Sequence, residues 1–341
     1  MPAVVVSAPV EANCQAPRWS PDGASLSYEA NDHVKKAVDL YVYTPSTRGT
    51  RKIVVPGSST AGSSLTSGFS TASAERVAHE ASFSPSGGHF VYSASGTSND
   101  YDLYLDTGSR VAGALGADGN PAWSPDGQHI AFTSARTGQG DIYLLNAAAL
   151  DAAPLRLTGD ETASEVYAAW SPDSASLAFV GHTPRGDNLY LVDNLQFPAP
   201  RPLTSWSHVQ TRPVFSPDGR RIAFYSNHTS PERFDLYVMP VGGTPTLVAT
   251  DVVMNARGPS WTPDGASLLY VQRDPNRLNP VRSAPWTDPT RAVTLATGTV
   301  GNGDLDVVRR ADGTVWLAIA AQGSSASPGT RDFMRIYLLS L

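Results

Sequence analysis

Polar and charged side chains recur at one position of a repeated phrase, and they are the residues of this sequence best placed to bind a ligand. Each copy of the phrase contains Ser-Pro-Asp-Gly or a variant of it, and the residue directly before this turn is usually Trp or Phe. The position of interest lies three residues before that Trp or Phe. Along the chain it is occupied by Ala16, Glu80, Asn120, Tyr167, Arg212, Gly258 and Asp306. An arginine can bind a carboxylate through two parallel hydrogen bonds, and we expect Arg212 to do so.

These residues have two interpretations. Because they carry both signs of charge, they could satisfy one another inside a hydrated channel. Alternatively, they form a channel mouth that orients a small polar ligand or the end of a peptide. With the preceding positions included, the candidate ligand-binding residues are Glu80, Asn120, Tyr167, Arg212, Asp306, Arg257 and His79.

The phrase itself predicts the fold. Its Ser or Thr occurs at Ser20, Ser84, Ser124, Ser171, Ser216 and Thr262, and Asp312-Gly313 continues the series in degenerate form. Apart from the first interval, the spacing is 40 to 47 residues. Each copy contains a run ending in Trp or Phe, a tight turn, an alternating strand, a strand of the type Asp-Ile-Tyr-Leu, and a short fourth strand. Proline and Asp-Gly are the residues that such a turn requires.

Four short strands per repeat, without helical periodicity, are typical of a β-propeller blade. We predict one all-β domain over residues 1–341, a seven-bladed propeller with blades near 13–56, 78–116, 118–158, 165–204, 209–250, 256–297 and 302–341. The N-terminal strand 3–7 completes the last blade, which removes two exposed sheet edges. The alternative is six blades with an irregular seventh segment. Residues 57–77 are rich in Gly, Ser and Thr and predict a flexible loop, either a flap over the mouth or an ordinary solvated loop.

Histidines gather on one expected face. In such a propeller the turns with the repeated phrase lie at one end of the ring, here called the turn face. The loops that enter the inner strands and join the second and third strands lie at the other end, the loop face. We expect five of the seven histidines there: His33, His79, His182, His208 and His228. Histidine is the commonest metal ligand. Only His79 and His208 directly approach inner strands, so they are the candidate ligands of a divalent metal, although we expect no cofactor.

The sequence Trp-Ser-Pro-Asp-Gly, followed by an alternating strand and an Asp-[Ile/Leu]-Tyr strand, resembles the repeat of the TolB-like, WD-like propellers. The likeness is strong over residues 17–295 and weak in the last copy. The family includes the periplasmic TolB translocation protein, propeller domains of prolyl-oligopeptidase-type peptidases, and oligogalacturonate lyases. The resemblance therefore implies a fold and several functions. TolB carries an N-terminal α/β domain before a six-bladed propeller, and no such domain fits before Pro17.

Composition narrows the function further. The net charge of −6, the sequence pI near 5.6 and the absence of long Lys/Arg runs argue against nucleic acid as a partner. Cys14 is the single cysteine, so no internal disulfide or Cys-x-x-Cys motif exists. No apolar stretch is long enough to span a membrane. The start Met1–Val6 shows no signal peptide, which fits a cytoplasmic protein or a mature form; the family resemblance implies a periplasmic or extracellular location.

No Gly-x-Ser-x-Gly nucleophile motif is present. We therefore expect a non-catalytic monomer that binds a protein, peptide or glycan partner through its loop face and channel mouth. The alternative function is a metal-assisted lyase or hydrolase of the oligogalacturonate-lyase type, acting on an acidic saccharide.

Overall fold

The structure is a computed structural model, and it describes residues 4–6, 12–55, 77–95, 101–111, 116–159, 164–184, 186–323 and 333–341. Regular structure in these ranges is β-strand except for one 3-10 turn, η1 (Pro289–Arg291). No helix among them is both long and apolar enough to cross a membrane. The predicted flexible loop 57–77 lies, apart from Val77, outside the described residues.

Three successive stretches of chain each form a four-stranded antiparallel sheet whose strands pair in sequence order. The first contains β2 (Asn13–Trp19), β3 (Leu26–Asp32), β4 (Ala37–Thr44) and β5 (Gly49–Lys52). The second contains β6 (Ala78–Phe83), β7 (Phe90–Ser95), β8 (Tyr101–Leu105) and β9 (Arg110–Val111). The third contains β10 (Asp118–Trp123), β11 (His129–Ser134), β12 (Asp141–Asn146) and β13 (Leu155–Arg156).

The next part of the chain forms one twelve-stranded sheet, in which similar sets of four strands are joined at their edges. The first set is β14 (Ser164–Trp170), β15 (Leu177–Thr183), β16 (Gly186–Val192) and β17 (Arg201–Pro202). The second is β18 (His208–Phe215), β19 (Arg221–Ser226), β20 (Phe234–Pro240) and β21 (Thr246–Val253). The third is β22 (Ser260–Trp261), β23 (Ser267–Gln272), β24 (Val281–Pro285) and β25 (Val293–Thr294). A parallel β16–β18 pair and an antiparallel β21–β23 pair connect the sets.

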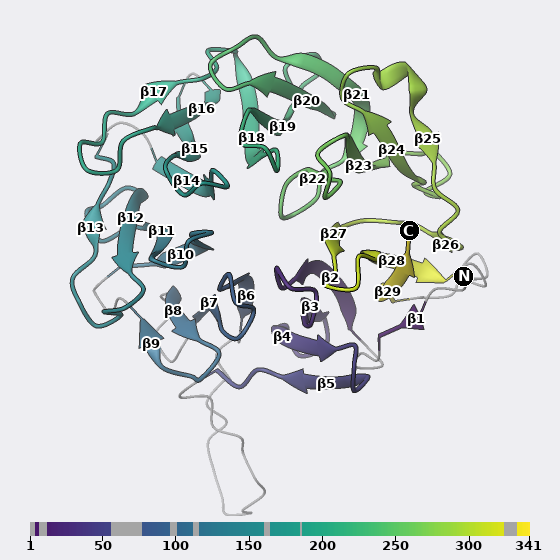
Figure 1. The fold of residues 1–341 in the computed structure, drawn as a ribbon, viewed down its shortest axis with the longest axis horizontal. Helices are drawn as coiled ribbons and strands as arrows, with labels where there is room; N and C mark the ends of the chain where they lie inside the picture. Colours follow the sequence, from purple (N-terminus) through teal and green to yellow (C-terminus); the bar gives the residue numbers. More distant parts are fainter. Residues whose placement is uncertain are drawn as a thin grey trace, which may run out of the picture.

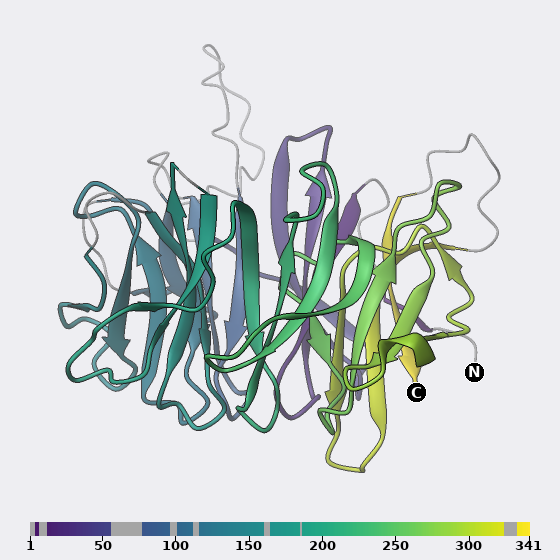
Figure 2. The ribbon, with the colours of Figure 1, turned by 90° about the horizontal axis from the view of Figure 1, so that it is seen from above.

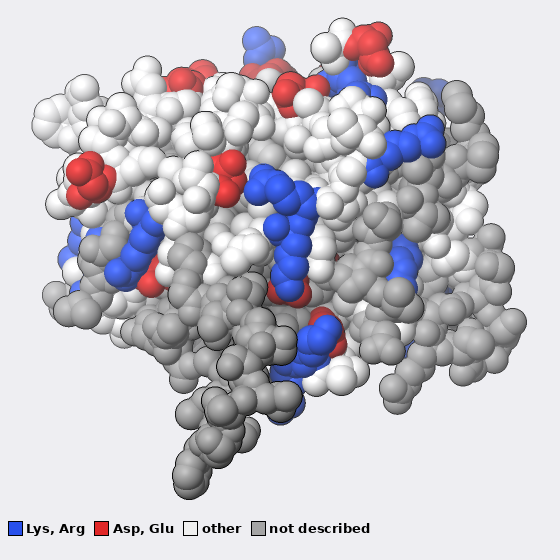
Figure 3. Space-filling view, turned by 90° about the horizontal axis from the view of Figure 1, so that it is seen from below, with Lys and Arg blue, Asp and Glu red and all other residues white. Residues whose placement is uncertain are grey.

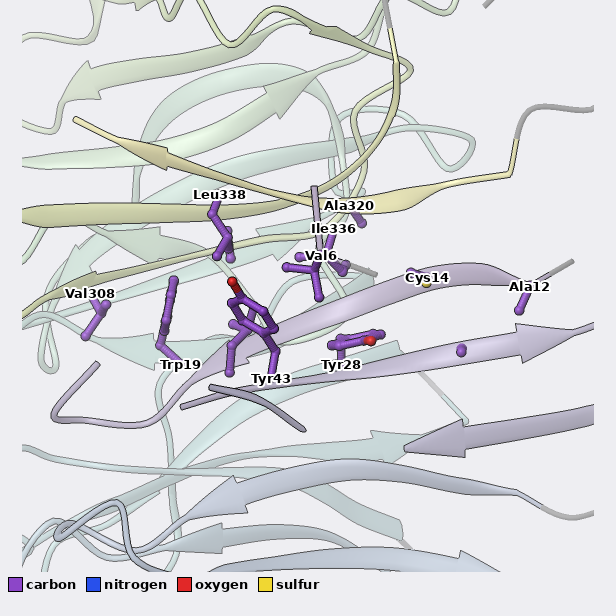
Figure 4. Close-up of a cluster of buried hydrophobic side chains, with 13 residues drawn as sticks. Val6, Ala12, Cys14, Trp19, Tyr28, Tyr43, Val308, Ala320, Ile336 and Leu338 are labelled. Atoms are coloured by element: carbon purple, nitrogen blue, oxygen red, sulfur yellow. The ribbon is translucent and has the colours of Figure 1, made fainter. Parts of the chain in front are cut away.

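The last sheet combines the two ends of the described chain. β27 (Leu305–Arg309), β28 (Val315–Gly323) and β29 (Arg335–Ser340) pair in order, and β26 (Thr299–Val300) pairs with the far end of β28. β1 (Val4–Val5) pairs antiparallel with β29, with Val4 opposite Leu338. The Val6 N–H donates to the Ile336 carbonyl at 2.9 Å. The Val6 side chain is 1% exposed and lies in a core cluster with Trp19, Tyr28 and Leu338 (Figure 4).

The sheets stand side by side around a central axis, as Figure 1 shows, and the side view in Figure 2 shows their strands running between two ends of the ring. β2, β6, β10, β14, β18, β22 and β27 lie nearest the axis (Figure 1). Hydrophobic clusters fill the spaces between neighbouring sheets, and the indoles of Trp170 and Trp261 donate hydrogen bonds to the preceding set of four strands. Trp170 Nε1, for example, donates to the Ala122 carbonyl at 2.9 Å.

The repeated turns are held by their own side chains. Ser20 Oγ donates to Asp22 Oδ1 at 2.5 Å, the Ala24 N–H donates to the same oxygen, and the Gly23 N–H donates to the Ser20 carbonyl. Gly23 has φ +66°, and a Cβ there would lie 2.8 Å from Arg310 Cγ, so a side chain at this position would be strained. The same Ser/Thr–Asp bond recurs at Ser124–Asp126, Ser171–Asp173, Ser216–Asp218 and Thr262–Asp264. These repeated aspartates are structural.

The aspartates that begin many third strands are structural as well, because they bind the fourth strand of their own sheet. Asp39 pairs with Lys52 at 2.6 Å, and Asp102 pairs with Arg110 at 2.5 Å. Asp141, which is 1% exposed, accepts a hydrogen bond from Arg156. Ligand chemistry therefore depends on residues outside these two repeated positions.

Candidate functional site

The predicted ring positions are the sites of a repeated backbone irregularity. The pairing of the inner strand shifts register at this point in β2, β6, β10, β14 and β18. The residue at the position has positive φ in each case: Ala16 (48°), Glu80 (61°), Asn120 (50°), Tyr167 (57°) and Arg212 (55°). Gly258, just before β22, has φ 96°. A β-bulge re-aims a side chain and frees a backbone N–H from the ladder, so the ring positions present both a side chain and an amide.

Asp306 differs from the other ring positions. It lies in the regular part of β27, opposite Ala318, without a bulge. Its carboxylate accepts the Trp19 N–H at 2.7 Å, and Arg18 Nη1 lies 4.0 Å away. Burial raises the pKa of Asp306 above its usual value, against the opposing effects of Arg18 and the Trp19 amide. Asp306 therefore links the last sheet to the first through a hydrogen bond.

A central cavity of about 700 Å³ lies inside the ring. Five of the predicted residues line it: Glu80, Asn120, Tyr167, Arg212 and Arg257. His79 and Asp306 are not among its lining residues. The rest of the lining includes Trp123, Trp170, Trp261 and the turn prolines Pro21, Pro125, Pro172, Pro217 and Pro263. The cavity thus extends from the bulges to the turn face, whereas the sequence placed the mouth at the loop face.

Arg212 has an unusual environment for a charged residue at the centre of a protein. Its guanidinium carbon lies 3.7 Å from the centroid of the Tyr167 ring, a cation–π arrangement. Among the described residues it has no ion-pair partner and its side chain makes no hydrogen bond. Its planar donors are therefore held in place by stacking and remain available to a ligand in the cavity.

Glu80, in contrast, is fully engaged. Asn120 donates to it through both its backbone N–H, at 2.8 Å, and its side-chain amide, at 2.6 Å. His79 Nδ1 lies 3.4 Å from the same carboxylate. Burial would raise the pKa of Glu80, but the hydrogen bond and charge of His79, the charge of Arg257 and the Asn120 amide outweigh it and hold the pKa at about 2. Glu80 is an anion that the protein itself satisfies.

Two acids that the sequence analysis missed organise the rest of the ring. Glu29, from β3, is 6% exposed, accepts the Glu80 N–H at 3.0 Å and lies 3.5 Å from Arg257 Nη2. Asp304 accepts the Ala16 N–H at 2.9 Å and the Ala256 N–H at 2.7 Å. Both carboxylates accept hydrogen bonds from backbone amides of neighbouring sheets: Glu29 from a bulge residue, and Asp304 from a bulge residue and from a residue just before β22. Neither lies at the repeated position, so the repeat alone could not reveal them.

The Arg257 side chain is largely buried. It is 15% exposed, and its Nε is buried without a hydrogen-bond acceptor among the described residues. Burial lowers the pKa of its guanidinium, against the opposing charges of Glu29 and Glu80. An unsatisfied buried donor beside the cavity is costly, and an anion in the cavity would reduce this cost.

Arginines are the main charged residues of the cavity lining. Among the described residues the charged lining side chains are Arg18, Arg212, Arg257, Arg309 and Glu80. Asp306 lies 4.0 Å from Arg18 and Glu29 lies 3.5 Å from Arg257, so acids just outside the lining compensate two of the arginines. On the outer side shown in Figure 3, the described Lys/Arg and Asp/Glu side chains are interspersed, with uncharged surface between them. Uncompensated positive charge therefore remains at Arg212, where the low-dielectric walls of the cavity strengthen its effect on a ligand.

The histidines do not form a cluster. His79 pairs with Glu80 and stacks edge-on against Tyr101, with ring centroids 5.2 Å apart. His208 is exposed, and its Nδ1 lies 3.1 Å from Ser207 Oγ. Across the described ranges, no three or more His, Cys, Asp or Glu side chains are grouped as a metal site would require.

Comparison with known proteins supports the architecture. No family model matches the chain. A stretch of 69 residues is 36% identical to the uncharacterized peptidase YuxL of Bacillus subtilis (strain 168), covering 19% of this chain and 10% of that protein. TolB from Acinetobacter baumannii superposes with a TM-score of 0.53 at 17% identity, covering 83% of this chain and 63% of that one. The chain therefore spans less than two thirds of either protein.

Two further structures extend the likeness to nearly the whole chain. A prolyl endopeptidase superposes with a TM-score of 0.59 at 13% identity, over 97% of this chain and 50% of that one. The Cps50 (Swd1) β-propeller domain of Myceliophteria thermophila gives 0.59 at 11% identity, over 99% of both chains. The protein is a β-propeller. More particularly, its fold is that of the TolB-like propellers, and these low identities concern the fold alone.

Proposed function

We propose that this protein is a non-catalytic propeller that binds an acidic segment of a protein or peptide partner in its central cavity. The observation that carries the proposal is Arg212, whose guanidinium stacks on Tyr167 in the lining of the cavity and has no anionic partner among the described residues. A carboxylate is the ligand that matches its planar pair of donors.

The composition of the walls supports a peptide. Between the arginines and the turn face, the cavity is lined by tryptophans and by the prolines of the repeated turns. Such a surface provides apolar contact area around a few charged anchors, which is the usual composition of a ligand pocket. Its volume of about 700 Å³ also falls in the usual range for such pockets.

The ring that holds this cavity is, we propose, seven-bladed, with β1 serving as the outer strand of the last blade. The pairing of Val4 with Leu338 supports this closure. We further propose that the protein acts as a monomer in the periplasm or outside the cell, by analogy with the TolB-like fold.

The test uses tetraglutamate as the probe and tetralysine as its opposite, measured by isothermal titration calorimetry. Wild type is expected to bind tetraglutamate only. Arg212→Ala removes a charge-assisted pair of hydrogen bonds worth about 1.5–3 kcal/mol, so affinity should fall about ten- to more than a hundredfold. Arg212→Lys should restore part of it, because an ammonium lacks the planar fork.

Arg291→Ala is the matched control, since Arg291 is an exposed arginine outside the cavity lining. It should leave binding unchanged. If Arg212→Ala keeps binding but lowers stability, Arg212 serves only the ring and the proposal is wrong. Binding of a tri-galacturonate in place of tetraglutamate, with stoichiometric metal and chain cleavage, would instead establish the metal-assisted lyase alternative.

A further inference from the structure

A second cavity, here called the rim cleft, lies away from the axis. It has a volume of about 520 Å³. Its lining comes from the end of β21, the β23–β24 loop, and the segments around β26 and β28: Asp251, Arg273, Asp274, Pro275, Arg277, Asn279, Gly301 and Gln322. None of these residues belongs to the repeated phrase or lines the central cavity.

The walls of the rim cleft are rigidly built. The Asn302 side-chain amide donates to the Asn279 carbonyl at 2.7 Å, and the Gly301 N–H donates to the Leu278 carbonyl at 2.9 Å. These bonds hold the β23–β24 loop against the following segment of chain. The Asp274 N–H donates to Asn279 Oδ1 at 3.1 Å, which closes the loop on itself.

Backbone strain is also concentrated here. Asp251, Arg277 and Asn279 all have positive φ, at 50°, 60° and 45°, although none is glycine. All three line the rim cleft. Left-handed backbone at non-glycine residues costs free energy and gathers at functional sites.

The charges of the rim cleft are balanced in number but not fully paired. Arg273 Nε donates to Asp251 Oδ1 at 3.1 Å. The Arg277 guanidinium has no acceptor among the described residues. The Asp274 carboxylate accepts the Asn276 N–H at 2.8 Å but faces no cation within ion-pair distance in the described ranges. One cleft thus holds an unpaired cation and an unpaired anion, three residues apart on one rigid loop.

We propose that the rim cleft binds a zwitterionic ligand of amino-acid or short-peptide size, with its carboxylate on Arg277 and its ammonium group on Asp274. A ligand carrying both charges matches a cleft with no net charge and two separate unpaired groups. A simple anion would be repelled by Asp274 and a simple cation by Arg277. Among the described residues that line the cleft none is aromatic, which disfavours a neutral sugar, because sugars usually stack on an aromatic ring.

Three related probes test the proposal by calorimetry at millimolar concentration. Glycylglycine carries both charges, N-acetylglycylglycine lacks the ammonium group, and glycylglycinamide lacks the carboxylate. Glycylglycine should bind most tightly. Arg277→Gln and Asp274→Asn should each weaken its binding about ten- to hundredfold, because each removes one charge-assisted contact.

The sign of the Asp274→Asn effect distinguishes the alternatives. For a zwitterion it weakens binding, whereas for a simple anion it strengthens binding by removing repulsion. Arg291→Gln should have no effect, and melting curves should show that all variants remain folded. These titrations are carried out in the Arg212→Ala background, so that a carboxylate bound in the central cavity does not contribute to the heat, and Arg277 and Asp274 are varied in the same background. No binding heat with glycylglycine in that background, or a stronger response to N-acetylglycylglycine, would overturn the proposal without bearing on Arg212.

Discussion

Removal of the N-terminal strand tests how the ring is closed. The Val6 side chain is 1% exposed, and burying a valine fully contributes about 1.5–3 kcal/mol. Its N–H bond to the Ile336 carbonyl adds about 0.5–1.5 kcal/mol. Deleting Met1–Ser7 should therefore lower the free energy of unfolding by at least about 2–4.5 kcal/mol, because the β1–β29 pairing and its protection of the sheet edge are lost as well.

This loss converts into a shift of the melting temperature. Unfolding entropy is about 2.1 cal/mol/K per residue, or about 0.7 kcal/mol/K for 341 residues. The deletion should therefore lower Tm by about 3–6 °C, measured by differential scanning calorimetry. Exposure of the β29 edge should also increase aggregation on heating.

Point variants separate the side chain from the strand. Val6→Ala removes about 1.6 kcal/mol of transfer free energy and should lower Tm by about 2 °C. Val54→Ala is the matched control, because Val54 is 60% exposed; its effect should stay within about 0.5 kcal/mol. Coincident melting curves for the deletion and wild type, or equal losses for the two alanine variants, would refute the reasoning.

Three further outcomes are expected. The pKa of Glu80 is lowered to about 2 in the folded protein. Its ionised form therefore stabilises the fold above the unfolded pKa, and this contribution is lost as pH falls from about 4.3 towards 2. Glu80→Gln should make the free energy of unfolding, measured by urea denaturation, less dependent on pH over that window. Asp118 is 1% exposed and lies 3.1 Å from Arg136, so Asp118→Ala should cost about 3–5 kcal/mol, whereas the same change at the exposed Asp193 should cost less than about 1 kcal/mol. Gly258 has φ 96°, and a Cβ there would lie 2.7 Å from Val214 Cγ2. Gly258→Ala should therefore lower the melting temperature more than Gly138→Ala, because Gly138 also has positive φ but has open space around its Cβ position. Equal losses of melting temperature would show that crowding at Gly258 is unimportant.

Much of the architecture could be read from the sequence because it is built from local interactions. The turn at Ser20-Pro21-Asp22-Gly23 is closed by bonds among residues at most five apart. The strands on either side then pair in sequence order. A short phrase of this kind carries its own backbone geometry, so its repetition predicted all-β sheets and the positions of the inner strands. At the position three residues before the aromatic, the inner strands of five successive sheets carry the same bulge, and Glu80, Asn120, Tyr167 and Arg212 line the central cavity.

The chemistry of the centre depended on tertiary structure. Arg257 lies near Glu29 across 228 residues of sequence, and Ala16 binds Asp304 across 288. Such contacts depend on how the first and last sheets meet around the axis, which a single copy of the repeat does not encode. They decide which charges are neutralised: Glu80 is satisfied by its neighbours, whereas Arg212 is left on Tyr167.

The set of residues that line the cavity was also decided by the folded ring. From the sequence, the polar positions marked where inner strands begin, which suggested the loop face. In the folded protein, side chains at the bulges line the central cavity together with the prolines of the repeated turns. The sequence by itself determined the repeat, its turns and the inner-strand positions, because these are local. The tertiary structure alone decided which side chains share the cavity and which of them stay unpaired, because burial and charge pairing arise only when distant sheets meet around one axis.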